Sequence, residues 1–474
     1  MNQSAPMRVL TVFSLAMITI GSVDSIRNLP ASALFSGSVA FFYLMAGLTF
    51  LIPAALVSAE LATGWPSRGG VYTWVKEAFG PRWGLLAVWY QWISNVIWYP
   101  TILSFMAGTI AHITIPELST QPIFMVAVIL VVFWFATGIN LLGMQASARF
   151  GVFCTAFGLI LPMIFIIALG VAWVVTGNPT QIPFELSSFI PRFDDPTLLV
   201  ALTAIILSCC GIEITSTHAL EVQSPQKDYP KALFISVLVI IATLILGSLS
   251  IAIVIPQEEI SLVAGLMQAF EAFLKYFNLQ SILPIFGAAI VIGVFGGLSN
   301  WIIGPSKGLL FGLKELNVGK MLHYENKRQV PAAVLLFQAC LCTVLSLIFF
   351  FMPTINSSYW ALTVLASQLY LVMYILLFAA AFWLRIKKPE VVRAYNIPGG
   401  KFGLGFVAAV GILACVFTIL IGFYPPSGMQ INSSWGYSLA ILGGFIVLSC
   451  PAFLFYRTYV NQKEQCAEFI PEKS

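Results

Sequence analysis

The sequence predicts an all-α integral membrane protein with twelve transmembrane helices. Hydrophobic residues fill 59% of the 474 positions and charged residues only 9%, whereas water-soluble domains are roughly half apolar and a quarter charged. Apolar stretches of about 18 residues or more recur along the chain, and each can cross a hydrocarbon layer of about 30 Å as a helix. Membrane spans therefore account for most of the protein, and the lipid bilayer is its expected surrounding.

The spans follow from these apolar stretches in chain order. We place them at 9–35, 38–63, 82–113, 122–142, 148–176, 197–222, 231–256, 281–310, 331–352, 358–385, 403–424 and 436–457. The stretch 259–277 carries apolar residues on one helical face and is predicted to lie along the outer surface as a helix. The chain then forms one domain over residues 1–457, followed by a short cytoplasmic tail at 458–474.

Basic residues decide which side each connection faces. Twenty of the 23 lysines and arginines fall in the two tails, in the connections on the same side as the tails, or at the span ends next to them. Arg192 and Lys275 fall on the other side, and Arg27 lies inside a span. Because cytoplasmic connections are enriched in lysine and arginine, both termini should face the cytoplasm. The net charge of +4 then indicates a basic rim beside lipid headgroups and no nucleic-acid partner.

The sequence lacks the patterns that other chemistries require. Its eight cysteines show no metal or redox spacing, and seven of them fall in apolar runs, so we expect no metal and no cofactor. His112, His218 and His323 are predicted at an outer end, inside a span and in a cytoplasmic connection, where they cannot converge. With no phosphate loop or nucleophile motif either, a membrane-embedded enzyme is not expected.

Two spans are interrupted in matching places, at Gly21 to Asp24 in the first span and at Cys210 to Glu213 in the sixth. In each, a glycine is followed within three residues by a carboxylate, which is costly inside a membrane and marks a functional site. An inverted repeat of five plus five helices, at 9–176 and 197–385, with two more helices at 403–457, accounts for both breaks. Unwound backbone in mid-membrane is typical of transporters, where it offers free N–H and C=O groups to a substrate.

The two carboxylates allow several interpretations. Asp24 could bind a substrate amine, cap the second half of the broken helix, or pair with Arg27 one turn later. Glu213 could bind the amine, take up a proton during transport, or accept hydrogen bonds that hold the break open. We take Glu213 as the candidate for proton coupling, which predicts transport that accelerates in acid.

Several motifs resemble the amino acid-polyamine-organocation superfamily of transporters. The segments that carry the resemblance are 58–63 (Ser-Ala-Glu-Leu-Ala-Thr), 69–75 (Gly-Gly-Val-Tyr-Thr-Trp-Val) and 79–84 (Phe-Gly-Pro-Arg-Trp-Gly). Segments 221–232, 299–306 and 396–400 are most similar to its bacterial glutamate/GABA antiporter branch. The resemblance covers roughly residues 10–457. It implies the LeuT-type fold, alternating access with amino acid exchange or proton-coupled uptake, and the bacterial inner membrane.

The resemblance also assigns a substrate site. The substrate carboxylate would meet backbone N–H groups at the first break, and its amine would meet carbonyls at both breaks. Asn95 matches a substrate-contacting asparagine of the related arginine/agmatine exchanger, Trp301 a gating tryptophan, and Tyr370 and Tyr374 a tyrosine pair. The candidate substrate-binding residues are Gly21, Ser22, Val23, Asp24, Asn95, Cys210, Gly211, Ile212, Glu213, Trp301, Tyr370 and Tyr374.

Differences from the glutamate/GABA exchanger leave the substrate and the coupling ion open. Gly297 stands where an acidic residue is expected, the segment with Asp24 and Arg27 differs, and the short tail predicts no regulation by a C-terminal plug. A neutral or acidic amino acid is favoured, and a polyamine, organic-amine or cationic amino acid exchanger is the alternative. A channel or nutrient sensor is more distant, because polarity is confined to the breaks. Both a monomer and a homodimer are compatible with the sequence.

Overall fold

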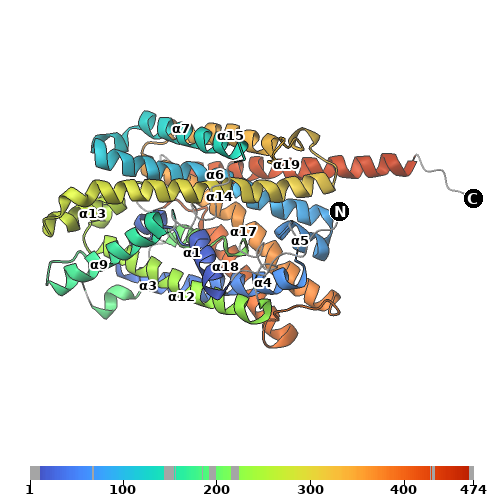
Figure 1. Cartoon of the computed structure of the whole chain (residues 1–474), viewed down its shortest axis with the longest axis horizontal. Coiled ribbons are helices and arrows are strands. Elements are labelled where there is room, and N and C mark those ends of the chain that lie inside the picture. The colour runs from blue at the N-terminus through green and yellow to red at the C-terminus, as the bar shows by residue number, and fades with distance from the viewer. Residues whose placement is uncertain are drawn as a thin grey trace, which may run out of the picture.

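The computed structural model is helical, with the helices running side by side in one elongated bundle (Figure 1). It describes residues 11–66, 69–143, 154, 156–183, 185–191, 199–214, 222, 224–426, 429 and 433–468. Arg8, Arg149, Arg192 and His218, which entered the sequence predictions, lie outside the described residues, as does the segment 215–221 of the sixth expected span.

Ten helices among the described residues are long and apolar enough to cross a membrane. They are η2 to α4 (Ser36–Gly64), α6 (Pro81–Thr114), α7 (Pro122–Leu141), η5 to α9 (Ala156–Val175), α12 (Pro225–Ala252), η9 to α14 (Gln280–Glu315), α15 to α16 (Ala332–Phe351), α17 (Ile355–Lys387), α18 (Gly400–Ile421) and α19 (Ser434–Glu468). These correspond to ten of the twelve expected spans. The last helix, α19, continues past residue 457 because the segment that follows is rich in polar helix formers.

The two remaining spans, 9–35 and 197–222, contain short helices, as the matched breaks predict. Helix α1 (Val12–Val23) ends at Asp24, and the chain resumes as η1 (Ile26–Asn28) and α2 (Leu29–Ala33). Helix α11 (Leu202–Ser208) stops just before Gly211, whose φ of +108° cannot continue a helix. Gly21 itself stays helical, so the first break lies a few residues later than the glycine suggested.

The middle of the bundle is built around α6, the most buried of the long helices. It packs along α14 and α17, while α1 lies along α12. Small residues let the backbones approach, as is usual for helices in lipid. A Cβ on Gly158 of η5 (Ala156–Ile160) would lie 2.1 Å from the Cα of Gly293 on α14, so these two backbones touch.

One end of the bundle is covered by α13 (Gly265–Tyr276), the helix predicted along the surface. Its apolar face is buried, with Leu266, Phe270 and Phe273 fully covered. The imidazole Nε2 of His112, near the end of α6, lies 2.9 Å from a carboxylate oxygen of Glu271 on the solvent side of α13. A polar contact thus supplements the apolar packing that holds α13 in place.

The opposite end gathers the basic segments that the sequence placed together. Figure 1 shows α5 (Val71–Phe79) and the far end of α19 at this end. Lys76 on α5 pairs with Glu315 at the end of α14 at 2.6 Å, and Lys388 pairs with Glu77 at 2.5 Å. These pairs join segments that are far apart in the sequence. They support the prediction that the basic connections lie at one end of the bundle.

A buried ion cluster lies at the same end. The carboxylate of Glu60 on α4 (Ile52–Gly64) is 1% exposed and accepts bonds from two N–H groups of Arg385, one of them at 2.7 Å. The backbone N–H of Ile397 donates to it at 3.0 Å, and Arg393 Nε lies 3.5 Å away. The segment after α17 is therefore folded back onto the end of α4.

Candidate functional site

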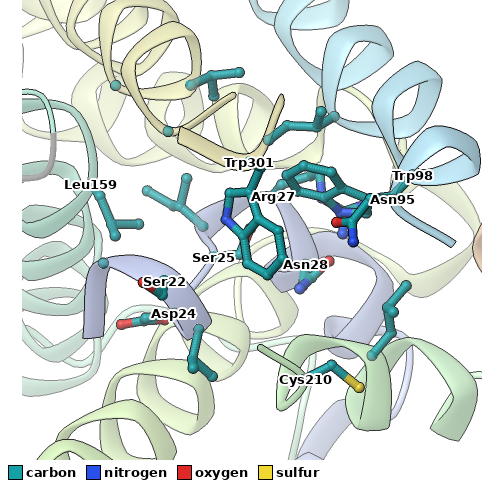
Figure 2. Close-up of a pocket in the computed structure, with 18 of the residues that line it drawn as sticks. Ser22, Asp24, Ser25, Arg27, Asn28, Asn95, Trp98, Leu159, Cys210 and Trp301 are labelled. Atoms are coloured by element: carbon teal, nitrogen blue, oxygen red, sulfur yellow. The ribbon is translucent and has the colours of Figure 1, made fainter. Parts of the chain in front are cut away.

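The two breaks meet at a cavity of about 100 Å³ inside the bundle (Figure 2). Its wall is formed by the first break, the end of α11, and the facing sides of η5, α6, α14 and α17. Of the predicted residues, those that line it are Gly21, Ser22, Val23, Asp24, Asn95, Cys210, Trp301 and Tyr370. Gly297, the position where the sequence departs from its relatives, lines it as well.

The other predicted residues, Gly211, Ile212, Glu213 and Tyr374, are buried beside the cavity and do not form its wall. The Tyr374 hydroxyl accepts a hydrogen bond from the backbone N–H of Gly211 at 2.8 Å. It also donates to the carboxylate of Glu213, so it ties the sixth-span break to α17. These residues lie at the sixth-span break on the side that faces away from the cavity.

Unwinding leaves backbone groups unpaired at the first break. Helix α1 ends at Val23, and no described residue donates to the carbonyl oxygens of Gly21, Ser22 or Val23. The backbone N–H groups of Ile26 and Arg27, which follow the break, likewise have no acceptor among the described residues. Helix ends leave such groups free, with partial negative charge at the carbonyl end and partial positive charge at the N–H end.

Gly211 brings the two breaks into contact. A Cβ at this position would lie 2.9 Å from Cη2 of Trp301 and 3.3 Å from the carbonyl oxygen of Ser22. The indole of Trp301 also packs against that of Trp98 on α6, with ring centroids 5.8 Å apart. Both the positive φ and the close approach therefore require glycine here.

Asp24 presents one free carboxylate oxygen. Its Oδ2 accepts a hydrogen bond from the Thr243 hydroxyl of α12 at 2.9 Å, while Oδ1 is buried and has no partner among the described residues. The alternative in which Asp24 pairs with Arg27 does not occur, because Arg27 extends toward α6 and α17 instead. A buried acceptor without a donor is costly, and a substrate amine would satisfy it.

Glu213 is the centre of a buried hydrogen-bond network. Its carboxylate is 2% exposed and accepts from Gln91 Nε2 at 3.0 Å, from the Tyr370 hydroxyl at 2.6 Å and from the Tyr374 hydroxyl. Tyr370 lines the cavity and Glu213 lies behind it, so a change at Glu213 reaches the cavity through Tyr370.

Arg27, Trp98 and Asn28 also line the cavity, although the sequence did not propose them as substrate-binding residues. Arg27 is 1% exposed, and its guanidinium lies 5.4 Å from the ring centre of Trp98. An arginine inside an apolar span is a signal of function in its own right, and this signal could have identified Arg27. Trp98 carried no such signal, because a tryptophan in a membrane helix usually serves packing.

No group of three or more His, Cys, Asp or Glu side chains in the described part of the chain is arranged to hold a metal ion. The cavity wall instead offers one carboxylate, one guanidinium, free backbone groups and aromatic rings. This set can bind a small molecule that carries both a positive and a negative group.

Comparisons with known proteins show what the chain is similar to. A sequence model of the amino acid permease family matches residues 10–446. An uncharacterized transporter of Legionella pneumophila is 41% identical over 98% of this chain and 99% of its own length. A glutamate/gamma-aminobutyrate antiporter of Lactococcus lactis is 30% identical over 97% of this chain and 92% of its own. A probable agmatine/putrescine antiporter of the same bacterium is 23% identical over 84% of each.

Proposed function

The chain belongs to the amino acid permease family, and we propose that it is a secondary active transporter that exchanges amino acids by alternating access. As a member of this family it is a multi-pass membrane transporter and not an enzyme. The observation that carries the proposal is the meeting of two broken helices on one buried cavity. Such a site can open to one side at a time when helices move around the breaks.

The proposed architecture has twelve spans, counting the two broken segments with the ten long helices. Spans one to five and six to ten form the two inverted repeats of a LeuT-type fold, and the last two follow them. The ion pairs of Lys76 and Lys388 at one end of the bundle support a single basic face, which we assign to the cytoplasm. The bacterial relatives support the inner membrane as its location.

The free groups at the first break suggest how an amino acid binds. Its ammonium group would bind the unpaired carbonyls of Gly21 to Val23 together with Asp24. Its carboxylate would bind the free N–H groups of Ile26 and Arg27, where the helix dipole favours negative charge. Trp301, which packs over Gly211, would close the cavity above the ligand.

Counterflow in proteoliposomes tests this function directly. Vesicles containing the purified protein are loaded with one unlabelled amino acid at a time, and uptake of labelled amino acids is measured at acid and neutral pH. An exchanger takes up label much faster into loaded vesicles than into empty ones. Equal rates in loaded and empty vesicles would exclude obligate exchange and indicate a uniporter or channel, while no flux of any amino acid or amine would contradict the proposed function.

A second candidate function is the exchange of polyamines or cationic amino acids. The unpaired Oδ1 of Asp24 favours it, since this oxygen would bind a cationic group of either ligand. The similarity to an agmatine/putrescine antiporter gives it further support. Including agmatine, putrescine and arginine in the counterflow experiment separates the two candidates.

Substituting Asp24 by asparagine should weaken substrate binding. The change removes a charge-assisted interaction with the ammonium group, so we expect the Michaelis constant for uptake to rise by roughly tenfold or more. The matched control is Thr243→Val, which removes the bond to Oδ2 and leaves the carboxylate in place; its effect should be smaller. Wild-type affinity in the asparagine variant would show that Asp24 only stabilises the break.

Substituting Glu213 by glutamine should flatten the pH dependence of transport. A proton on Glu213 would turn an acceptor into a donor, so its hydrogen bonds to Gln91, Tyr370 and Tyr374 would have to rearrange. Tyr374 also accepts the N–H of Gly211, so this rearrangement would reach the break. The measurement is the initial rate of uptake between about pH 5 and pH 8. A pH profile unchanged from that of the wild type would remove Glu213 from proton coupling.

A further inference from the structure

Arg27 is a buried cation for which the described residues supply no counter-ion. No carboxylate among the described residues lies within ion-pair distance of its guanidinium, although the side chain is 1% exposed. A charged group removed from water is normally paired, because an isolated buried charge is strongly unfavourable. Asp24, the nearest acidic residue in the sequence, is turned toward Thr243 on α12. A negative group on a bound ligand can therefore supply the counter-ion of Arg27.

The guanidinium is held in a fixed orientation. Its Nη1 donates to the Thr101 hydroxyl at 2.9 Å and to the Tyr359 hydroxyl at 3.0 Å. The rings of Trp98 and Tyr359 lie 5.4 and 5.7 Å from its centre, close enough for cation–π attraction. Its Nε is buried and has no hydrogen-bond partner in the part of the chain that the structure describes. Two elements, α6 and α17, thus fix the plane of the guanidinium, whose Nη2 donates to no described residue.

Arg27 and Asp24 belong to different parts of the cavity wall. Figure 2 shows Arg27 beside Trp98 and Trp301, and Asp24 beside Ser22 on the other side of the break. The cavity therefore presents a positive and a negative side chain that do not neutralise each other. A bound molecule can contact both.

We propose that Arg27 is the receptor for a second carboxylate, carried on the side chain of the substrate, and that the site consequently selects acidic amino acids. This inference rests on the proposed amino acid transport. In that binding mode the ammonium group is bound by Asp24 and the free carbonyls, and the α-carboxylate is bound by the free backbone N–H groups. Arg27 is then the one charged group of the cavity wall left over, and a planar guanidinium matches a carboxylate in shape and charge.

The same arrangement disfavours dications. A diamine or a cationic amino acid would place its second positive group in a cavity that already holds the buried charge of Arg27. That repulsion is strong where water is excluded. Arg27 therefore favours the exchange of acidic amino acids over the exchange of polyamines or cationic amino acids.

L-glutamate and L-glutamine form a matched pair for testing this role, because they share their length and α-groups and differ in side-chain charge. Binding of each to the purified wild-type protein and to Arg27→Gln is measured by competition with the labelled substrate found by counterflow. We expect the wild type to bind glutamate more tightly than glutamine. In Arg27→Gln the ratio of the two affinities should fall by about 10- to 100-fold. Asp24→Asn should weaken both ligands alike, because both carry the ammonium group.

Tyr359→Phe and Arg27→Lys keep the inference testable if Arg27→Gln does not fold. The phenylalanine removes one anchor of the guanidinium, and the lysine keeps the charge without the planar fork. Each should reduce the glutamate preference less than Arg27→Gln would. Equal affinity of the wild type for glutamine and glutamate would overturn the role of Arg27 while leaving amino acid transport intact. So would variants that weaken the binding of both ligands equally. Failure to bind any amino acid would instead overturn the proposed function.

Discussion

Replacing Gly211 by alanine is expected to reduce the rate of transport by roughly 5- to 150-fold. The φ of +108° at this position costs an L-residue about 1–3 kcal/mol, which corresponds to that range. The added Cβ would also lie 2.9 Å from Trp301 Cη2, so the indole would have to shift. Since this glycine joins the two breaks, the strain falls on the conformation that binds substrate. Initial uptake rates, normalised to reconstituted protein, measure the effect.

Gly304→Ala is the matched control. It lies on α14, one turn after Trp301, its Cβ would meet nothing within 4 Å, and its φ is not positive. Alanine should be tolerated there with rates within about twofold of the wild type, because it is the better helix former. Equal rates for wild type and Gly211→Ala, or equal losses in both variants, would show that the contact between the breaks is not required.

Replacing Glu60 by alanine is expected to destabilise the protein by about 3–5 kcal/mol, the usual cost of breaking a buried ion pair from one side. Its carboxylate is 1% exposed and neutralises Arg385, which stays 11% exposed, with Arg393 nearby. Without it, two largely buried guanidinium groups lose their counter-ion, and the segment that follows α17 loses its attachment through Ile397. Thermal unfolding in detergent, followed by size-exclusion chromatography, measures the loss.

Glu315→Ala provides the comparison for this prediction. Glu315 is 37% exposed and its partner Lys76 24% exposed, and ion pairs at such positions contribute at most about 1 kcal/mol. The two variants remove the same group from the same end of the bundle and differ mainly in burial. Similar unfolding temperatures for both variants would mean that the Glu60 cluster does not stabilise the fold.

Much of the fold could be predicted because lipid imposes a simple rule. Every backbone group in the hydrocarbon must be satisfied within its own helix, so helix length and hydropathy identify helices such as α7 and α18 directly. The same rule makes interruptions conspicuous, and the breaks near Gly21 and Gly211 are confirmed. The exact end of α1 could not be predicted, since it depends on the bond between Asp24 and Thr243, which lies in a distant segment.

The candidate site, like the fold, has a part that the sequence predicts and a part that depends on tertiary packing. Gly21, Ser22 and Val23, together with Asn95, Cys210, Trp301 and Tyr370, line one cavity, whereas Gly211 and Ile212 lie beside it. Glu213 was identified as unusual, but its place behind Tyr370 follows only from the packing of α17 against the break.

The sequence by itself determined the membrane setting, the long spans, the two matched breaks and the membership suggested by its motifs, because each depends on local composition or spacing. The tertiary structure decided which groups the breaks bring together: Gly211 against Trp301, Asp24 toward α12, and Arg27 between α6 and α17, where no described carboxylate pairs with it. Those placements depend on contacts between residues up to 332 positions apart, which no local pattern encodes.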